Sequence, residues 1–160
     1  MTNLIIDGQL ADNSFTHLDD EAALPASGDI SVSTQRWLDE ADALAAHDGT
    51  VAPRLNGADE LLNVVAKLHK LEVICLEFPA FADGRCYSFA TRLRRSGFEG
   101  QIRALGNVLR DQMFYMQRVG INAFEVDEGR DAEAAIESLK DFSETYQAAS
   151  DNPLPIYRQV

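Results

Sequence analysis

The loop Asp83, Gly84 and Arg85 combines an acid, a flexible glycine and a cation. It follows the apolar run 73–78, which is typical of a buried strand, and it precedes 85–96, which has the spacing of an amphipathic helix. In open α/β sheets the loops at the carboxyl ends of strands usually carry the ligand sites, and a helix N-terminus offers free N–H groups to an anion. The pattern therefore indicates a binding site for a small anion.

Two further loops are expected at the same edge of the sheet, after strands predicted at 102–105 and 123–126. Their arginines would supply planar donors for a carboxylate, a phosphate or a sulfur oxyanion, and their aspartates could orient the arginines or act as acid or base. In the alternative interpretation, Asp83 and Asp111 cap helices and pair with arginines, which holds the loops together. The predicted anion site comprises Asp83, Gly84, Arg85, Tyr87, Ser88, Asn107, Arg110, Asp111 and Gln112, with Asp127, Glu128 and Arg130 from the third loop.

Seven arginines lie between residues 85 and 118, where Glu99 and Asp111 are the only acids, although the whole chain has a net charge of −12. So acidic a chain is a poor partner for nucleic acid, and a confined arginine cluster fits a small anion or an acidic protein surface. The alternative is a solvated helix face with local ion pairs. The predicted partner interface combines arginines with the apolar group at 113–116, and it comprises Arg92, Arg95, Met113, Tyr115 and Met116, of which Tyr115 is expected to be the exposed apolar member.

Other reactive groups are expected to be structural. Glu77 lies within an apolar strand, and Arg103 on the neighbouring strand is its predicted partner. Cys86 stands beside Arg85 at a helix N-terminus, where thiol pKa values fall, yet it lies on the apolar face, where a buried thiol is inert. The sequence has no phosphate-loop, dinucleotide-binding or nucleophile-elbow motif and no Cys/His pairs at metal spacing. Neither a cofactor nor a metal is expected.

The predicted elements alternate along the chain and give an α/β fold class. A hairpin is expected around Asp7-Gly8, and Pro53 favours either an edge position or a poor strand for 51–55. The alternation indicates parallel βαβ units, which fit a doubly wound sheet or a half-barrel-like sheet, with a small N-terminal β-hairpin. Strands are predicted at 30–32, 51–55, 73–78, 102–105 and 123–126, and helices from about 35 and 59 and over 85–96, 110–119 and 132–147.

The length of 160 residues predicts one α/β domain over 30–150, with a peripheral hairpin and loop at 1–29 and a tail at 151–160. No apolar run reaches membrane-spanning length, and the first residues lack the features of a secretory signal. Two cysteines give no disulfide framework. We therefore expect a cytoplasmic protein without a membrane partner.

Five motifs lie between residues 78 and 124: Phe78-Pro-x-Phe-x-Asp-Gly-Arg-x-Tyr-Ser88, Arg92-Leu-Arg-x-x-Gly-Phe98, Gly100-x-Ile-Arg-Ala104, Val108-Leu-Arg-Asp-Gln112 and Met116-x-Arg-x-Gly-x-x-Ala-Phe124. Together they resemble a bacterial family named domain of unknown function 934, and the likeness covers roughly residues 50–127. Cys86 stands where the family commonly has Gly, and Asn107 where it commonly has Asp. Members are typically encoded beside assimilatory sulfite reductase and are often described as oxidoreductases, and the family brings no established catalytic residues.

The resemblance implies a role in sulfate or sulfite assimilation, with sulfite reductase or another sulfur-assimilation protein as the partner. The preferred hypothesis is an accessory protein that binds a partner protein or a small oxyanion without a redox cofactor of its own. The alternative is a small α/β enzyme that acts on an anionic metabolite at the carboxyl edge of the strands. Whether the chain is catalytic stays open at this point, as does a homo-oligomer formed through residues 113–116.

Overall fold

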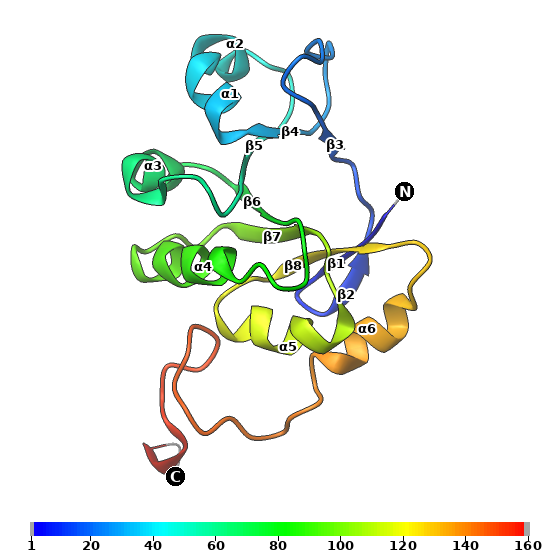
Figure 1. The fold of residues 1–160 in the computed structure, drawn as a ribbon, viewed down its shortest axis with the longest axis vertical. Coiled ribbons are helices and arrows are strands. Elements are labelled where there is room, and N and C mark those ends of the chain that lie inside the picture. The colour runs from blue at the N-terminus through cyan, green and yellow to red at the C-terminus, as the bar shows by residue number, and fades with distance from the viewer. Residues whose placement is uncertain (1, 159–160) are drawn as a thin grey trace.

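A computed structural model describes residues 2–158, which form one eight-stranded sheet in the order β2-β1-β8-β7-β6-β5-β4-β3 (Figure 1). The strands are β1 (Thr2–Ile6), β2 (Gln9–Ala11), β3 (Thr16–His17), β4 (Ile30–Ser33), β5 (Val51–Leu55), β6 (Val73–Phe78), β7 (Gln101–Gly106) and β8 (Ala123–Asp127). The helices are α1 (Thr34–Asp39), α2 (Ala41–Ala45), α3 (Leu61–Leu68), α4 (Arg85–Arg95), α5 (Arg110–Arg118), α6 (Ala132–Ser138) and the short 3₁₀ helix η1 (Ile156–Arg158).

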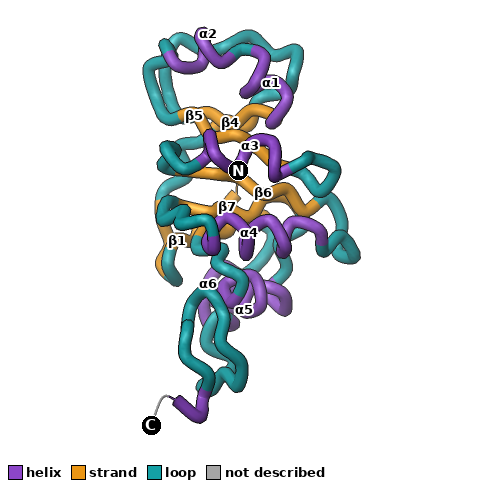
Figure 2. The backbone as a smooth tube through the Cα atoms, turned by 90° about the vertical axis from the view of Figure 1, so that its left-hand side faces the viewer, coloured by secondary structure: helices purple, strands orange, loops and turns teal. Residues whose placement is uncertain are grey.

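Strands β3 to β8 are parallel and lie side by side in chain order. Crossovers of one hand between consecutive strands place all their helices on the same face, whereas a doubly wound sheet reverses its strand order and carries helices on both faces. The half-barrel-like alternative is therefore confirmed, and the doubly wound one is not adopted. Figure 2 shows α3 and α4 in front of the strands, on the convex face of the curled sheet.

The N-terminal hairpin is also confirmed. Asp7 and Gly8 have φ values of 49° and 77°, as a tight hairpin turn of this kind requires. Strand β1 runs antiparallel between β2 and β8, so it is a member of the main sheet. Leu4 and Ile5 of this strand are buried.

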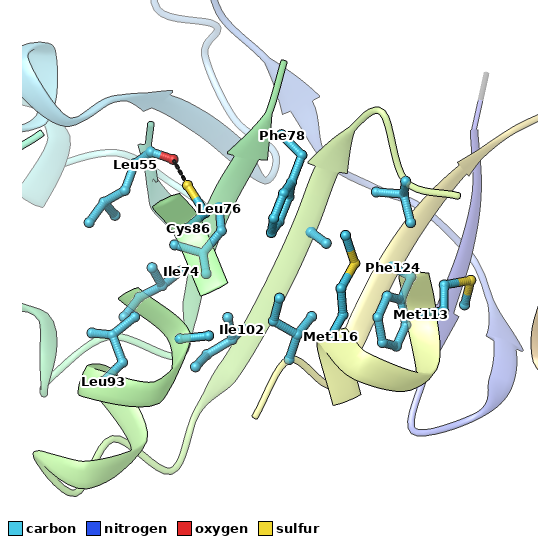
Figure 3. Close-up of a cluster of buried hydrophobic side chains, with 14 of the residues drawn as sticks. Leu55, Ile74, Leu76, Phe78, Cys86, Leu93, Ile102, Met113, Met116 and Phe124 are labelled. Atoms are coloured by element: carbon cyan, nitrogen blue, oxygen red, sulfur yellow. Dashed lines mark hydrogen bonds between the residues drawn. The ribbon is translucent and has the colours of Figure 1, made fainter. Parts of the chain in front are cut away.

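The main core lies between the convex face of the sheet and the helices (Figure 3). Alternate residues of β6, namely Ile74, Leu76 and Phe78, point toward the helices, as expected from the two-residue period of a strand. From α4, Cys86 and Leu93 join them. Hydrophobic burial on this face fixes which side of α4 faces inward and which side faces solvent.

The chain between β2 and β3 crosses the opposite, concave face. We call residues 12–17 the crossing segment. Phe15 packs against a second cluster of buried side chains, which consists of Ala52, Val73, Cys75 and Leu105. In Figure 1 this blue segment runs on the side of the sheet away from α3 and α4. The concave face is consequently covered by the chain itself.

Two local predictions are wrong. Pro53 lies in an interior strand, so the edge position is wrong; β5 pairs along four residues with β4 but along only two with β6, which agrees with the alternative of a poor strand and lets the missing N–H be tolerated. The helix predicted at 132–147 ends at Ser138. Phe142 and Tyr146, which continue the apolar spacing of the predicted helix, are 64% and 77% exposed. Beyond Leu139 the chain has left the sheet: Phe142 keeps a ring contact with Phe114 of α5, but neither Phe142 nor Tyr146 reaches the core.

No helix among residues 2–158 combines the length and the apolar character needed to cross a membrane.

Candidate functional site

The three predicted loops open at one edge of the sheet, because β6, β7 and β8 are parallel. Two of them are joined through their backbones: the Asn107 N–H donates to the Phe78 carbonyl at 2.7 Å. Gly106 makes this approach possible, since its φ is 87° and a Cβ atom there would lie 2.6 Å from the Phe78 oxygen. This hydrogen bond therefore fixes the position of the second loop relative to the first.

Asp83 and Arg85 form an ion pair within the first loop. The Arg85 Nε and Nη2 atoms donate to the two carboxylate oxygens at 2.9 and 2.8 Å, and the backbone N–H of Arg85 donates to Oδ1 at 3.2 Å. These hydrogen bonds lower the pKa of Asp83 to about 2. Gly57 leaves room for the guanidinium, because a Cβ there would lie 2.4 Å from Nε. Asp83 is thus an ionised partner of Arg85, as in the alternative interpretation from the sequence.

The second loop leaves a cation available. Arg110 and Asp111 are exposed at the start of α5, and their side chains make no hydrogen bond or ion pair with residues 2–158. Gln112 is used structurally, since its side-chain amide donates to the Phe81 carbonyl at 3.2 Å. Asn107 is half-buried. Of the four predicted site residues in this loop, Arg110 is the one whose charge can attract an anion, and the equally exposed Asp111 beside it would repel one.

Some of the remaining residues of the predicted anion site contact other side chains, and others are exposed to solvent. Tyr87 is half-buried, and its ring centroid lies 5.3 Å from both the Phe78 and the Tyr115 rings. Burial raises the pKa of the Tyr87 hydroxyl. Ser88 is exposed. In the third loop Arg130 pairs with Asp127 at 3.6 Å, within its own turn. That the whole set binds one anion stays a prediction.

Three of the five residues of the predicted partner interface are exposed, and the other two are buried in the core. Met113 and Met116 are fully buried and belong to the core, because α5 turns both toward the sheet, so neither can form a surface. Tyr115 is 60% exposed, as expected. Arg92 and Arg95 are exposed on α4 and make no side-chain hydrogen bond or ion pair with any residue that the structure describes. We call Arg92, Arg95 and Tyr115 the α4–α5 face.

Arg94, which stands between those two arginines, is used differently. Its guanidinium donates to the carbonyls of Gly120, Phe98 and Gly100, each at 2.8 Å, and to the side chain of Asn122 at 3.2 Å. Burial lowers the pKa of this group. Arg94 therefore fastens the end of α4 to the loops around it, and only its neighbours on the helix remain for recognition.

The concave face holds a buried charge network whose connections the sequence did not reveal. Arg103 and Glu125, both about 4% exposed, form an ion pair at 3.1 Å. His17 lies at the far edge of the sheet, yet its Nε2 is 2.9 Å from Glu125. Burial alone would raise the pKa of Glu125, but hydrogen bonds from His17 and Arg103 outweigh it and hold the pKa below its ordinary value. The predicted pairing of Arg103 with Glu77 is wrong, because Glu77 lies opposite Leu105.

His17 also contacts the Ser31 hydroxyl through Nδ1 at 2.6 Å, so Ser31, His17 and Glu125 are linked in the manner of a hydrolase triad. Two observations argue against catalysis. Ser31 is completely buried, so no substrate can reach its oxygen, and Arg103 already neutralises the acid. The network instead ties β3 to β8 across the concave face. A charged residue among apolar neighbours in each of two strands was the signal available in the sequence.

Neither thiol is a nucleophile in this fold. Burial raises the pKa of Cys75 and of Cys86 to about 12. The Cys86 Sγ lies 3.3 Å from the Glu77 carbonyl oxygen and 4.0 Å from the Leu55 carbonyl oxygen, and Figure 3 draws the contact with Leu55. Among residues 2–158, no three His, Cys, Asp or Glu side chains gather closely enough to hold a metal ion.

Comparison with known proteins agrees with the motifs. No curated protein and no solved structure matches the chain. The family model described as "Bacterial protein of unknown function (DUF934)" matches residues 52–157, a stretch that runs from β5 to the 3₁₀ helix and includes all three loops, α4 and α5. The chain therefore belongs to the DUF934 family of bacterial proteins.

Proposed function

We propose that this chain is an accessory protein of assimilatory sulfite reduction, which binds an acidic surface of a partner protein and has no redox cofactor of its own. The observation that carries the proposal is the α4–α5 face. There, α4 carries two exposed arginines without a partner in the described chain, and the exposed Tyr115 of α5 packs on Tyr87 of the same helix, on a protein whose net charge is −12. The assignment to sulfur assimilation comes from the resemblance, because members of the family are typically encoded beside assimilatory sulfite reductase.

The residue types on this face suit protein recognition. Arginine and tyrosine are enriched among the residues that dominate binding energy at interfaces. Arg92 and Arg95 have no ion pair with residues 2–158 to break, so they can offer planar donors to carboxylates at little cost. Tyr115 rests on Tyr87 at 5.3 Å between centroids, which limits its freedom before binding. The face thus has cations and a preorganised aromatic ring.

A second candidate function is an enzyme, or a binding protein, for a small anionic metabolite at the carboxyl edge. Arg110 is the observation in its favour, since its charge is free beside the loop that carries Arg85. An anion would have to compete with Asp83 for Arg85, which makes this site the weaker one. A thermal-shift screen with sulfate, sulfite, phosphate, adenylyl sulfate, flavins and nicotinamide nucleotides tests it, because a true ligand raises the melting temperature. A hit that Arg110→Ala leaves unchanged would disprove this site.

The partner hypothesis is tested by affinity capture from the source bacterium grown on sulfate as its sulfur source. The tagged full chain is compared with the double variant Arg92→Glu/Arg95→Glu. We expect the native chain to retain sulfite reductase or another sulfur-assimilation protein, and the variant to lose about tenfold or more of it, since like charges at an interface cost several kcal/mol. The double variant Lys70→Glu/Lys140→Glu makes the same charge change at two other exposed positions, and it should behave like the native chain.

Two outcomes would contradict the proposal. One is that the native chain enriches no sulfur-pathway protein. The other is that both charge-reversal variants lose the partner equally, which would show that net charge alone, and not the α4–α5 face, controls the capture.

A further inference from the structure

The chain after α6 returns to the end of α5 and is held there by a buried arginine. Arg118, 8% exposed, donates through Nη1 to the Asp151 carboxylate at 2.5 Å and through Nη2 to the Gln147 carbonyl. Ser150 adds two bonds: its N–H donates to the Arg118 carbonyl at 3.0 Å and its hydroxyl to the Val119 carbonyl at 3.2 Å. We call residues 147–153 the returning segment. Asp151 is the only carboxylate that pairs with Arg118 among the described residues.

The returning segment is weakly anchored apart from this contact. Nearly all side chains between Lys140 and Asp151 are exposed, and the preceding stretch touches α5 through the Phe114–Phe142 ring contact, with centroids 4.9 Å apart. In Figure 2 this part of the chain extends away from the sheet below α5 and α6. Segments with few buried apolar contacts open locally at low free energy.

Between the returning segment and the end of α4 lies a hollow of about 770 Å³. Residues 148–150 form one wall, and the opposite wall includes Arg94, Arg95 and Arg118, with Glu99 as the only acid of the lining. Arg95 belongs to the α4–α5 face, so the hollow continues that face toward the C-terminal ends of the two helices. Carboxylates are therefore favoured there by Arg95 and Arg118, while Arg94 is occupied by carbonyl groups.

We propose that Arg118 and Arg95 form a receptor for an acidic segment of the partner protein, and that the returning segment is an internal occupant of this receptor. This inference rests on the proposed function. It adds that the partner binds through an acidic segment, and that binding is regulated, because a carboxylate of that segment must displace Asp151 from Arg118. A buried arginine needs a carboxylate in either state, so exchange of one carboxylate for another costs less than leaving the charge unpaired. Because the internal carboxylate is tethered, it competes at a high effective concentration and weakens every external ligand.

The receptor is tested with a capped, fluorescently labelled peptide that copies residues 146–155, and with the full chain carrying Asp151→Asn. We expect the peptide to bind this variant about tenfold or more tighter than the native chain, since the competing internal carboxylate is gone. Asp141→Asn in the full chain removes an exposed acid of the same stretch and should leave the peptide affinity at the native value. A peptide with Asn in place of Asp151 should not bind. Fluorescence anisotropy measures all four cases.

Hydrogen exchange shows whether the segment detaches. In Asp151→Asn we expect the Ser150 amide, which donates to Arg118, to lose about tenfold or more of its protection, while amides inside β6 and β7 keep theirs. Unchanged protection of Ser150 would overturn the proposal, because the segment would not depend on the ion pair. Detachment without peptide binding would overturn it as well, because the emptied site would not be a receptor.

The peptide assay contains no sulfur-assimilation protein, so it can succeed when affinity capture fails. That combination would support the receptor and would contradict the proposal that the partner is a sulfur-assimilation protein. If both hold, Asp151→Asn should also retain more of the captured partner than the native chain does, and a lower yield would count against the internal occupant.

Discussion

An arginine on the concave face of the sheet is buried and paired within the protein, whereas two arginines on the convex side are exposed. On the concave face Arg103 is about 4% exposed, pairs with Glu125 and lies under Phe15, whose ring centroid is 4.3 Å from the guanidinium carbon. On the convex side Arg92 and Arg95 stand in solvent without a partner in the described chain. Residue type therefore does not reveal function here; burial and the presence of an internal carboxylate do.

The difference follows from the elements that carry the residues. A strand residue that points to the concave face is enclosed by the curled sheet and by the crossing segment, so its charge must be neutralised within the protein. A helix on the convex side exposes one stripe of its surface, where a charge is solvated and stays available. Arg94, on the same helix, shows the intermediate case, with its hydrogen-bonding groups directed to backbone carbonyls.

The largest effect is expected when the concave pair is broken. Glu125→Leu leaves Arg103 buried without its carboxylate, which should lower the free energy of unfolding by about 3–5 kcal/mol. The double variant Arg103→Met/Glu125→Leu removes both charges and should recover most of that loss. Urea denaturation monitored by circular dichroism measures both. A single variant as stable as the native chain would show that the pair does not hold the concave face together.

A smaller effect should separate two neighbours on α4. Arg94→Met leaves several carbonyl acceptors without a donor and should cost about 1–3 kcal/mol of unfolding free energy. Arg95→Met changes an exposed side chain without a partner in the described residues and should stay within about 0.5 kcal/mol. The same urea titration compares them. If both variants lost the same free energy of unfolding, Arg94 would not be more important for stability than Arg95, and the distinction between them would be wrong.

The smallest effect concerns the pair of Asp83 and the exposed Arg85. The pKa of Asp83 is lowered from 3.8 to about 2, so the pair contributes stability that is present above pH 3.8 and lost as pH falls through about 2. NMR titration of the Asp83 carboxyl carbon measures this directly. In Arg85→Gln the pKa should move part of the way back toward 3.8, because the guanidinium donors are gone while the backbone N–H of residue 85 still donates to Oδ1. A native pKa near 3.8 would show that the pair does not persist in solution.

The fold was largely predictable. Hairpin, strands 73–78 and 102–105, and helix 85–96 were predicted close to their observed bounds, because strong periodicity and Gly8 and Gly97 mark them locally. The end of α6 was missed, since its apolar spacing continues past the point where the sheet can cover it. The choice between a half-barrel and a doubly wound sheet was equally hidden, because strand order depends on long-range pairing.

The candidate site was predictable in part. The loop residues share an edge because parallel strands require it, and Tyr115 was identified as exposed. The pairs were less accessible: Asp83 with Arg85 is local and was foreseen as an alternative, whereas Arg103 with Glu125 was assigned to the wrong acid. Pairing across strands depends on register and on which face a side chain takes, and neither can be read from one strand alone.

The sequence by itself determined the local elements, the acidic character of the chain, the arginine-rich stretch and the motifs of its family. Only the tertiary structure decided which arginines are free: the curl of the sheet brings His17 of β3 to Glu125 of β8, and the returning segment brings Asp151 to Arg118. The physical reason is that a charge's partner is set by distance in space and by exclusion of water, both of which arise only when remote segments pack.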